Sequence, residues 1–241
     1  MTGERAARSN SSDTKQILWT PEEVGFFWDW MSANAPDYFT ETAGPGILSK
    51  ARQLLPKTAK RVLDFGSGPG FLTRLLVQSF PDVYALDFSE ESIANLRARV
   101  PGVVDTFLYS SSPQYESIKV DVVFLIETIE HLDDKTKKDV FEKIRSLLNV
   151  GGKLFVSCPN EENLQTNKIC CPSCRTEFHR MQHVSSYSPE KLSRELQNFG
   201  FKVDHVGVTN FKYGKFGQKV RELSSSVTGR KLPHLYACAS L

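Results

Sequence analysis

The sequence predicts an α/β fold in which a mostly parallel sheet carries helices on both faces. Two observations carry this prediction. Short apolar runs alternate with amphipathic helical segments from residue 61 onward, and a glycine-rich turn follows the first of these runs. Such alternation is typical of βαβ crossovers, which build a parallel sheet buried between two layers of helices. The 40% apolar content of the 241 residues suffices for one sizeable core, so we expect one main domain with modest additions.

Seven strands and the helices between them follow from the apolar patterning. The strands are expected at 61–65, 83–87, 102–107, 121–126, 152–158, 202–208 and 234–240. The intervening helices are expected at about 71–80, 89–98, 135–148 and 188–199. Ser89 and Ser188 suit the N-cap positions, and Gly151 and Gly200 lie where helices should stop.

Three further regions surround this core. Residues 1–15 are polar and are expected to form a disordered tail. Residues 16–58 are expected to form a helical lid. Its first helix opens at the capping box Thr20-Pro21-Glu22-Glu23 and runs to about Ala33, and a second helix covers about 45–55. The main domain is expected at 59–241, with an insertion at 159–187 that is rich in cysteine and histidine.

Nothing in the sequence resembles a secretory leader or a membrane span, so a cytoplasmic protein without a membrane span is expected. In that reducing compartment, clustered cysteines suggest a metal site or free thiols rather than disulfides. The sequence does not predict the oligomeric state.

The glycine-rich turn indicates which cofactor is bound. Glycines occur at 66, 68 and 70, directly after the first strand, where the backbone can approach a ligand closely. Their spacing differs from the G-x-G-x-x-G of dinucleotide-binding proteins, which disfavours a nicotinamide oxidoreductase. Asp64 precedes the turn and suits a ligand with a cationic amine, whereas Asp87 ends the next strand and can bind ribose hydroxyls. These features predict S-adenosylmethionine.

This pattern resembles motif I of the class I S-adenosylmethionine-dependent methyltransferases. The resemblance implies a Rossmann-like seven-stranded sheet whose seventh strand is antiparallel and lies beside the fifth. It also implies that Phe88 stacks on adenine, and that Ser110 stands where the family usually has an acidic residue. The implied cofactor-binding residues are Asp64, Gly66, Ser67, Gly68, Gly70, Asp87, Phe88, Ser110 and Glu127.

The segment after the fourth strand, Glu127-Thr128-Ile129-Glu130-His131, carries a second motif. If it is helical, both carboxylates and the imidazole project from one side and suit a divalent cation. With His183, it resembles ubiquinone-pathway O-methyltransferases and metal-dependent small-RNA 2′-O-methyltransferases. This resemblance implies that Glu127, Glu130, His131 and His183 hold Mg²⁺ or another divalent ion. The alternative is a metal-free site in which Glu130 and His131 are the catalytic residues.

The insertion carries a third motif, Cys170-Cys171-Pro172-Ser173-Cys174 followed by His179 and His183. Its spacing is typical of a small zinc site, so Cys171, Cys174 and His179 are expected to bind structural Zn²⁺. Cys170 can substitute for a histidine, and both metal sites compete for His183. The alternative is a pair of free thiols. Cys158 and Cys238 lie in expected strands and are interpreted as small core residues.

We expect O-methylation of a small-molecule hydroxyl, assisted by a divalent metal. The runner-up is RNA 2′-O-methylation, and a cofactor-binding regulatory subunit without catalysis is the second alternative. The formal net charge of +2 does not indicate a polycation. A basic window nevertheless suggests either a solvated helix face or a rim for a phosphorylated or anionic substrate. It consists of Lys212, Lys215, Lys219, Arg221, Arg230 and Lys231.

Overall fold

The computed structural model describes residues 15–16, 19–34, 38–110, 115 and 117–241. The predicted tail at 1–15 lies outside the described residues except for Lys15, which belongs to a short strand, β1 (Lys15–Gln16).

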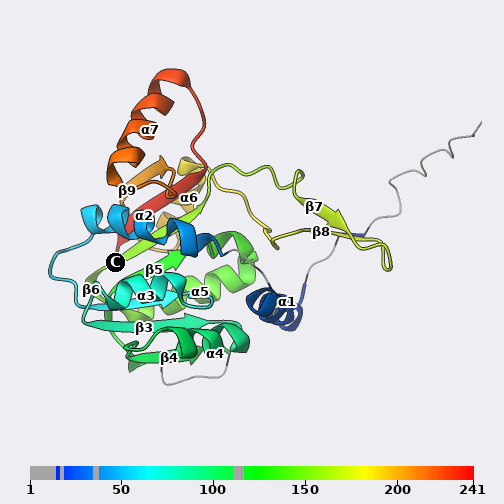
Figure 1. Ribbon diagram of the computed structural model, residues 1–241, viewed down its shortest axis with the longest axis horizontal. Coiled ribbons are helices and arrows are strands. Elements are labelled where there is room, and N and C mark those ends of the chain that lie inside the picture. The colour runs from blue at the N-terminus through cyan, green and yellow to red at the C-terminus, as the bar shows by residue number, and fades with distance from the viewer. Residues whose placement is uncertain (1–14, 17–18, 35–37, 111–114, 116) are drawn as a thin grey trace, which may run out of the picture.

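A seven-stranded sheet forms the centre of the molecule, as predicted (Figure 1). Its spatial order is β4-β3-β2-β5-β6-β10-β9, and β10 is antiparallel to both of its neighbours. The expected placement of the seventh strand beside the fifth is therefore confirmed. The strands are β2 (Arg61–Phe65), β3 (Asp82–Asp87), β4 (Asp105–Leu108), β5 (Val120–Ile126), β6 (Leu148–Pro159), β9 (Lys202–Thr209) and β10 (His234–Ser240).

Helices cover both faces of the sheet. Alternate residues of β2 face opposite layers: Leu63 packs with α5 and α6, whereas Val62 packs with α2 and α3. A third apolar cluster joins α4 to the same face as α3. The helices are α1 (Pro21–Asn34), α2 (Phe39–Leu54), α3 (Phe71–Val77), α4 (Glu90–Arg99), α5 (Asp134–Leu147), α6 (Pro189–Asn198) and α7 (Lys215–Thr228).

Local signals place most helix starts correctly. The Thr20 hydroxyl accepts from the Glu23 N–H, and the Glu23 carboxylate accepts from the Thr20 N–H, which is the predicted capping box. Ser89 and Ser188 cap α4 and α6. The predicted start of the second helix, at about residue 45, was wrong. It begins at Phe39 and contains Pro45, which sequence rules place in a first turn.

Two other elements differ from the prediction: the start of β6 and the helix α7. β6 begins at Leu148 rather than at 152, because the strand passes through an irregularity at Gly151, whose φ is +76°. The helix α7, between β9 and β10, is absent from the expected elements. It projects from one end of the sheet in Figure 1, far from the β7–β8 hairpin.

The segment expected as an insertion contains this hairpin, β7 (Lys168–Cys170) and β8 (Thr176–His179). β1 pairs in parallel with β8 and completes a three-stranded sheet. Among the described residues, no helix has the length and apolar character needed to cross a membrane.

Candidate functional site

The turn after β2 has the backbone shape that glycine permits and other residues resist. Gly66, Gly68 and Gly70 have φ values of +76°, +52° and +87°. A Cβ on Gly66 would lie 2.4 Å from the Thr128 Oγ1, so this turn touches the turn that follows β5. The Ser67 hydroxyl is buried there without a hydrogen-bond partner, which leaves a polar group free for a ligand.

Two buried carboxylates flank the glycine turn. Asp64 accepts from the Thr73 hydroxyl at 2.7 Å, and Asp87 accepts from the Gly68 N–H at 2.8 Å. Burial raises the pKa of Asp64 to about 7 and the pKa of Asp87 to about 6. Buried carboxyl groups with raised pKa values favour a ligand that brings positive charge or hydroxyl donors.

Aromatic side chains border the same turn. The Tyr38 ring lies against Gly68, because a Cβ added there would be 3.0 Å from the Tyr38 Cε1. Phe88 is half-buried and its ring centroid lies 4.4 Å from that of Tyr109. The Phe88 ring centroid also lies 6.2 Å from that of Phe65, the residue before Gly66, whereas Ser110 is exposed and follows β4.

A second cluster lies where β5 ends, at the same edge of the sheet. Ligand atoms of Glu130, His131 and His183 lie within 4.8 Å of one another. Both carboxylate oxygens of Glu130 are buried without a hydrogen-bond partner. Burial and the neighbouring Glu127 raise the pKa of Glu130, and burial and His183 lower the pKa of His131 to about 3.

The sequence placed Glu127 in this ligand group, and the structure corrects that placement. Among the described residues, Glu127 is not part of the group that contains Glu130 and His131. Its φ of +49° ends the strand in a left-handed turn, so the helical register begins only at Ile129. The Glu127 carboxylate instead accepts from the Ser157 hydroxyl on β6 at 2.9 Å.

His183 reaches the cluster because its segment is bound to the turn after β5. The Glu130 carbonyl accepts from the Val184 N–H at 2.8 Å, and the Gln182 amide donates to the His131 carbonyl at 3.1 Å. These contacts on both sides of His183 fix its position. His131 and His183 are more than fifty residues apart in the sequence, so residue spacing does not indicate that the two side chains lie close together.

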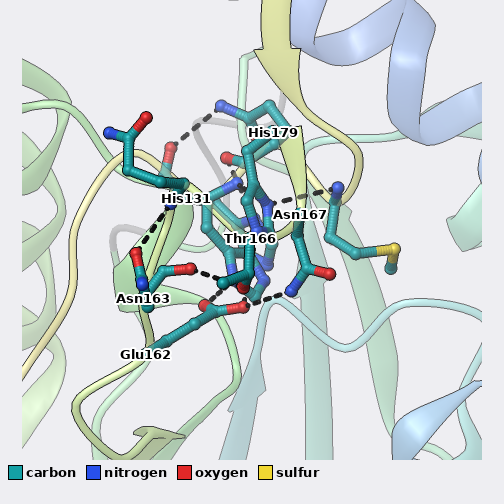
Figure 2. A network of polar contacts seen from close by, with 10 residues as sticks. His131, Glu162, Asn163, Thr166, Asn167 and His179 are labelled. Carbon is teal, nitrogen blue, oxygen red and sulfur yellow. Dashed lines mark hydrogen bonds and ion pairs between the residues drawn. The ribbon is translucent and has the colours of Figure 1, made fainter. Parts of the chain in front are cut away.

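Glu162 connects His183 with His179. Figure 2 shows Glu162 within a network of polar contacts that includes Asn167 and His179. One Glu162 oxygen lies 2.5 Å from the His183 Nδ1, and the other lies 3.4 Å from the His179 Nε2. The Asn167 side chain also donates to Glu162, at 3.1 Å. Hydrogen bonding and charge from His183 lower the pKa of Glu162, which outweighs the effect of its burial.

These contacts determine the tautomers of both imidazoles. An ionised carboxylate only accepts, so the His183 Nδ1 carries a proton and its Nε2 keeps a lone pair when the ring is neutral. The His179 Nδ1 accepts from the Met181 and His183 N–H groups, so its proton is on Nε2, facing Glu162. His179 therefore supports Glu162, and His183 offers one free nitrogen.

The predicted zinc set is not assembled. Cys171 and Cys174 lie at the tip of the β7–β8 hairpin, where the Cys171 N–H donates to the Thr176 carbonyl. From Thr176 the chain extends along β8, and His179 pairs with Lys168 at the far end of the hairpin. Within the described ranges, His179 groups with Glu162 and His183 and not with the thiols. Cys158 and Cys238 are buried, as expected.

Backbone strain concentrates around the second cluster. Four described residues other than glycine have positive φ, and three of these are Glu127, Glu161 and Gln182. Each is within three residues of Glu130, Glu162 or His183. Such conformations cost of order 1–3 kcal/mol each and are enriched at functional sites.

Sequence reasoning missed three polar or aromatic contributors. Glu162 follows a strand exit and has no periodic signature. Asp29, on α1, accepts from the Ser89 hydroxyl at 2.6 Å and raises the pKa of Asp87. Trp28 packs edge-on against His131 at 4.8 Å between ring centroids. The contact of Trp28 with His131 joins residues about one hundred positions apart, so no local pattern in the sequence indicates it.

Comparisons with known proteins identify the family of the chain. Residues 41–206 match the methyltransferase domain family, which is more than half of the chain. The ubiquinone biosynthesis O-methyltransferase of Xanthomonas axonopodis pv. citri is 29% identical over 136 residues, covering 54% of this chain and 56% of the relative. The enzyme of the same name from Paraburkholderia phymatum is 32% identical over 149 residues, covering 58% and 63%.

These matches thus span less than two thirds of each relative. Among solved structures, a DhpI–SAH complex has a TM-score of 0.63 and 20% identity, covering 91% of this chain and 95% of the other, which demonstrates a shared fold. The resemblance to small-RNA methyltransferases is not shown. The glycine turn, the topology and the family match together place the chain in the methyltransferase domain family, as a class I S-adenosylmethionine-dependent methyltransferase.

Proposed function

We propose that this enzyme methylates a hydroxyl group of a small molecule. The supporting observation is the contact between two turns: Gly66, in the glycine turn, lies against Thr128, next to Glu130 and His131. A cofactor held by the first turn would present its methyl group to the second, where proton acceptors gather. The names of the ubiquinone biosynthesis relatives support oxygen as the acceptor atom.

The cofactor would be held as the sequence predicts. Asp64 would face the cationic amine and Asp87 the ribose hydroxyls, with Phe88 beside the adenine. Residues 16–58 would act as a lid over the main domain at 59–241, because Tyr38 lies on Gly68 and Asp29 bonds to Ser89. These roles are consistent with burial of both carboxylates and with the unpartnered Ser67 hydroxyl.

His183 is the residue best prepared to accept the proton of the acceptor hydroxyl. Its Nδ1 is bound to Glu162, so its Nε2 lone pair is available and a positive charge on the ring would be stabilised by the carboxylate. His131, whose pKa is lowered to about 3, is a weaker base and would instead shape the site. Transfer of the methyl group would then follow mainly from proximity and alignment.

The same residues fit a divalent cation. Glu130 supplies two buried oxygens without partners, and His131 and His183 supply nitrogens, a donor set that suits Mn²⁺, Fe²⁺ or Zn²⁺ better than Mg²⁺. A bound cation would lower the pKa of the acceptor hydroxyl. It would use the same His183 lone pair as direct proton transfer does, so the two modes exclude each other.

Transfer of labelled methyl from S-adenosylmethionine to a metabolite extract and, separately, to small RNA tests the acceptor class. The proposal expects label in the metabolite pool, in a product one methylene heavier whose new carbon is bound to oxygen. Label only in RNA would contradict it. Repeating the assay after chelation and verified metal removal distinguishes the two modes, since full activity would exclude the cation.

A further inference from the structure

The helix α7 (Lys215–Thr228) has its apolar side facing outward. Phe216, Val220, Leu223 and Val227 follow one another at helical spacing and are 82%, 49%, 69% and 87% exposed. We call these four residues the α7 stripe. A helix on a globular protein normally turns such a stripe toward the core. Here the core-facing side of the helix is polar.

Polar contacts hold the opposite side of α7 against the body. The buried Gln218 side chain donates to the Gly46 carbonyl on α2 at 3.1 Å, and Glu222 binds Lys50 at 2.8 Å. Gly46 permits this approach, because a Cβ there would lie 2.9 Å from the Gln218 Nε2. The helix cannot turn its stripe inward without losing these contacts, so the outward orientation is built into the fold.

Cationic side chains surround the stripe. Lys212, Lys215 and Lys219 are exposed, and Arg230 follows the helix. The acidic residue of the helix, Glu222, is already neutralised by Lys50. Among the described residues, only Lys231 of the basic window has a carboxylate partner, Glu161. The surface therefore combines an apolar strip with an uncompensated positive rim.

We propose that α7 binds the surface of an anionic lipid bilayer. Apolar residues flanked by lysines are the pattern of helices that lie in a membrane interface, with the stripe in the acyl region and the lysines at the headgroups. A protein partner is less suitable, because lysines are depleted at protein interfaces.

Two other occupants fit poorly. A second copy of the chain would add its own uncompensated lysines to the same surface, where the carboxylate of the helix, Glu222, is already paired with Lys50. Residues 1–14 contain one large apolar side chain, Met1, and so cannot cover the four residues of the stripe.

The helix α7 is connected to the edge of the sheet that carries the candidate site. The chain enters the helix after β9 and leaves it into β10, whose His234 pairs with Pro159 at the end of β6. Lys231 binds Glu161, the neighbour of Glu162. The proposed lipid-binding surface thus adjoins the edge of the sheet that carries the candidate site, and it stands independently of the acceptor proposed above.

Sedimentation of the full chain with vesicles tests this inference. We expect binding to phosphatidylcholine vesicles that contain phosphatidylglycerol, weak binding to pure phosphatidylcholine, and loss of binding as salt screens the rim. The double variant Phe216→Ser/Leu223→Ser should lower vesicle binding at least about tenfold, and Lys215→Glu/Lys219→Glu should lower it for the anionic vesicles. Val150→Ser, at a fully exposed valine far from α7 in the sequence, is the matched control and should bind normally.

Thermal unfolding and cofactor affinity of each variant establish that it is folded. Equal binding by the wild type and the stripe variant would overturn the proposal, as would equal binding to neutral and anionic vesicles. Absence of vesicle binding together with a dimer in analytical ultracentrifugation, lost in the stripe variant, would overturn it in favour of self-association.

Discussion

Glu162 illustrates how one carboxylate can organise a site without touching a substrate. Its two oxygens face two imidazoles. The tautomer of His183 follows from that arrangement, whereas the tautomer of His179 follows from the two N–H groups that donate to its Nδ1. Partners of this kind orient a functional histidine and fix its tautomer. In the proposed function, Glu162 is a positioning residue that acts through His183.

Replacing Glu162 by glutamine tests this role. Glu162→Gln keeps the size but removes the charge that stabilises a proton on His183, so kcat should fall about 10- to 100-fold while cofactor affinity stays nearly constant. Nitrogen NMR of His183 should change from one tautomer to a mixture. Glu161→Gln is the control, because Glu161 pairs with Lys231 instead. Unchanged kcat and an unchanged tautomer would contradict the role.

Asp64 should make cofactor binding depend on pH. Its pKa is raised to about 7, so it is largely protonated at acidic pH and gains charge as pH rises. If it faces the cofactor amine, affinity should increase between about pH 6 and pH 7.5, by up to tenfold per unit, before the amine itself loses its proton near pH 8. Calorimetric titration measures this.

In Asp64→Asn, the rise in affinity on the acidic side should disappear, leaving uniformly weaker binding. Asp82→Asn is the matched control, since Asp82 begins β3 at the opposite edge and pairs only weakly with Arg61 at 3.7 Å. A rise that persists in Asp64→Asn would assign the titration to another group, such as Asp87.

At the scale of elements, the glycine turn shows how a strand, a turn and a helix depend on one another. Gly70 caps α3 in a left-handed conformation, and a Cβ there would lie 2.8 Å from the Leu96 side chain. The turn thus combines a backbone requirement with close packing against α4. Both requirements hold the start of α3 at the edge of the sheet where the cofactor is proposed to bind.

Two alanine substitutions separate these requirements. Gly70→Ala should lower the free energy of unfolding by about 2–4 kcal/mol, because it adds strain and overpacking. Gly151→Ala has a similar φ of +76° but open space around the added Cβ, so it should cost only about 1 kcal/mol. Chemical denaturation compares them. Equal losses would mean that packing at Gly70 contributes nothing.

For the molecule as a whole, the buried carboxyls couple stability to pH and to cations. Burial raises the pKa values of Glu127 and Glu130, so the folded state holds their protons when the unfolded chain has released them. These groups therefore make the protein less stable as pH rises from their ordinary pKa toward the raised values. A bound cation would reverse this loss by favouring the ionised forms.

Adding Mn²⁺ should consequently raise the midpoint of thermal unfolding more at pH 8 than at pH 5.5. Scanning fluorimetry with and without the ion, at each pH, gives the difference directly and cancels the opposite contributions of buried histidines. Glu130→Gln should abolish the shift, while Glu142→Gln, on the exposed side of α5, should keep it. A shift that is independent of pH would argue against Glu130 as a ligand.

The sequence predicted the sheet because alternation of apolar runs is a property of neighbouring residues. It could not predict α7, since that helix turns polar Gln218 inward. For the site, the resemblance and the helical spacing both grouped Glu127 with Glu130 and His131, and the cysteine spacing grouped His179 with the thiols. Among the described residues, the structure separates Glu127 and His179 from those groups. Both errors arose where local backbone geometry, a left-handed residue and an extended strand, replaced the assumed helix or knuckle.

The position of β10 between β6 and β9 bears on how the chain folds during synthesis. Of the strands in this sheet, β10 leaves the ribosome last, yet it occupies an interior place. Until it emerges, β6 and β9 each present an unpaired edge, and such edges recruit other chains. The nascent protein therefore passes through a stage with a gap in its sheet, during which the edges of β6 and β9 are open to pairing with other chains.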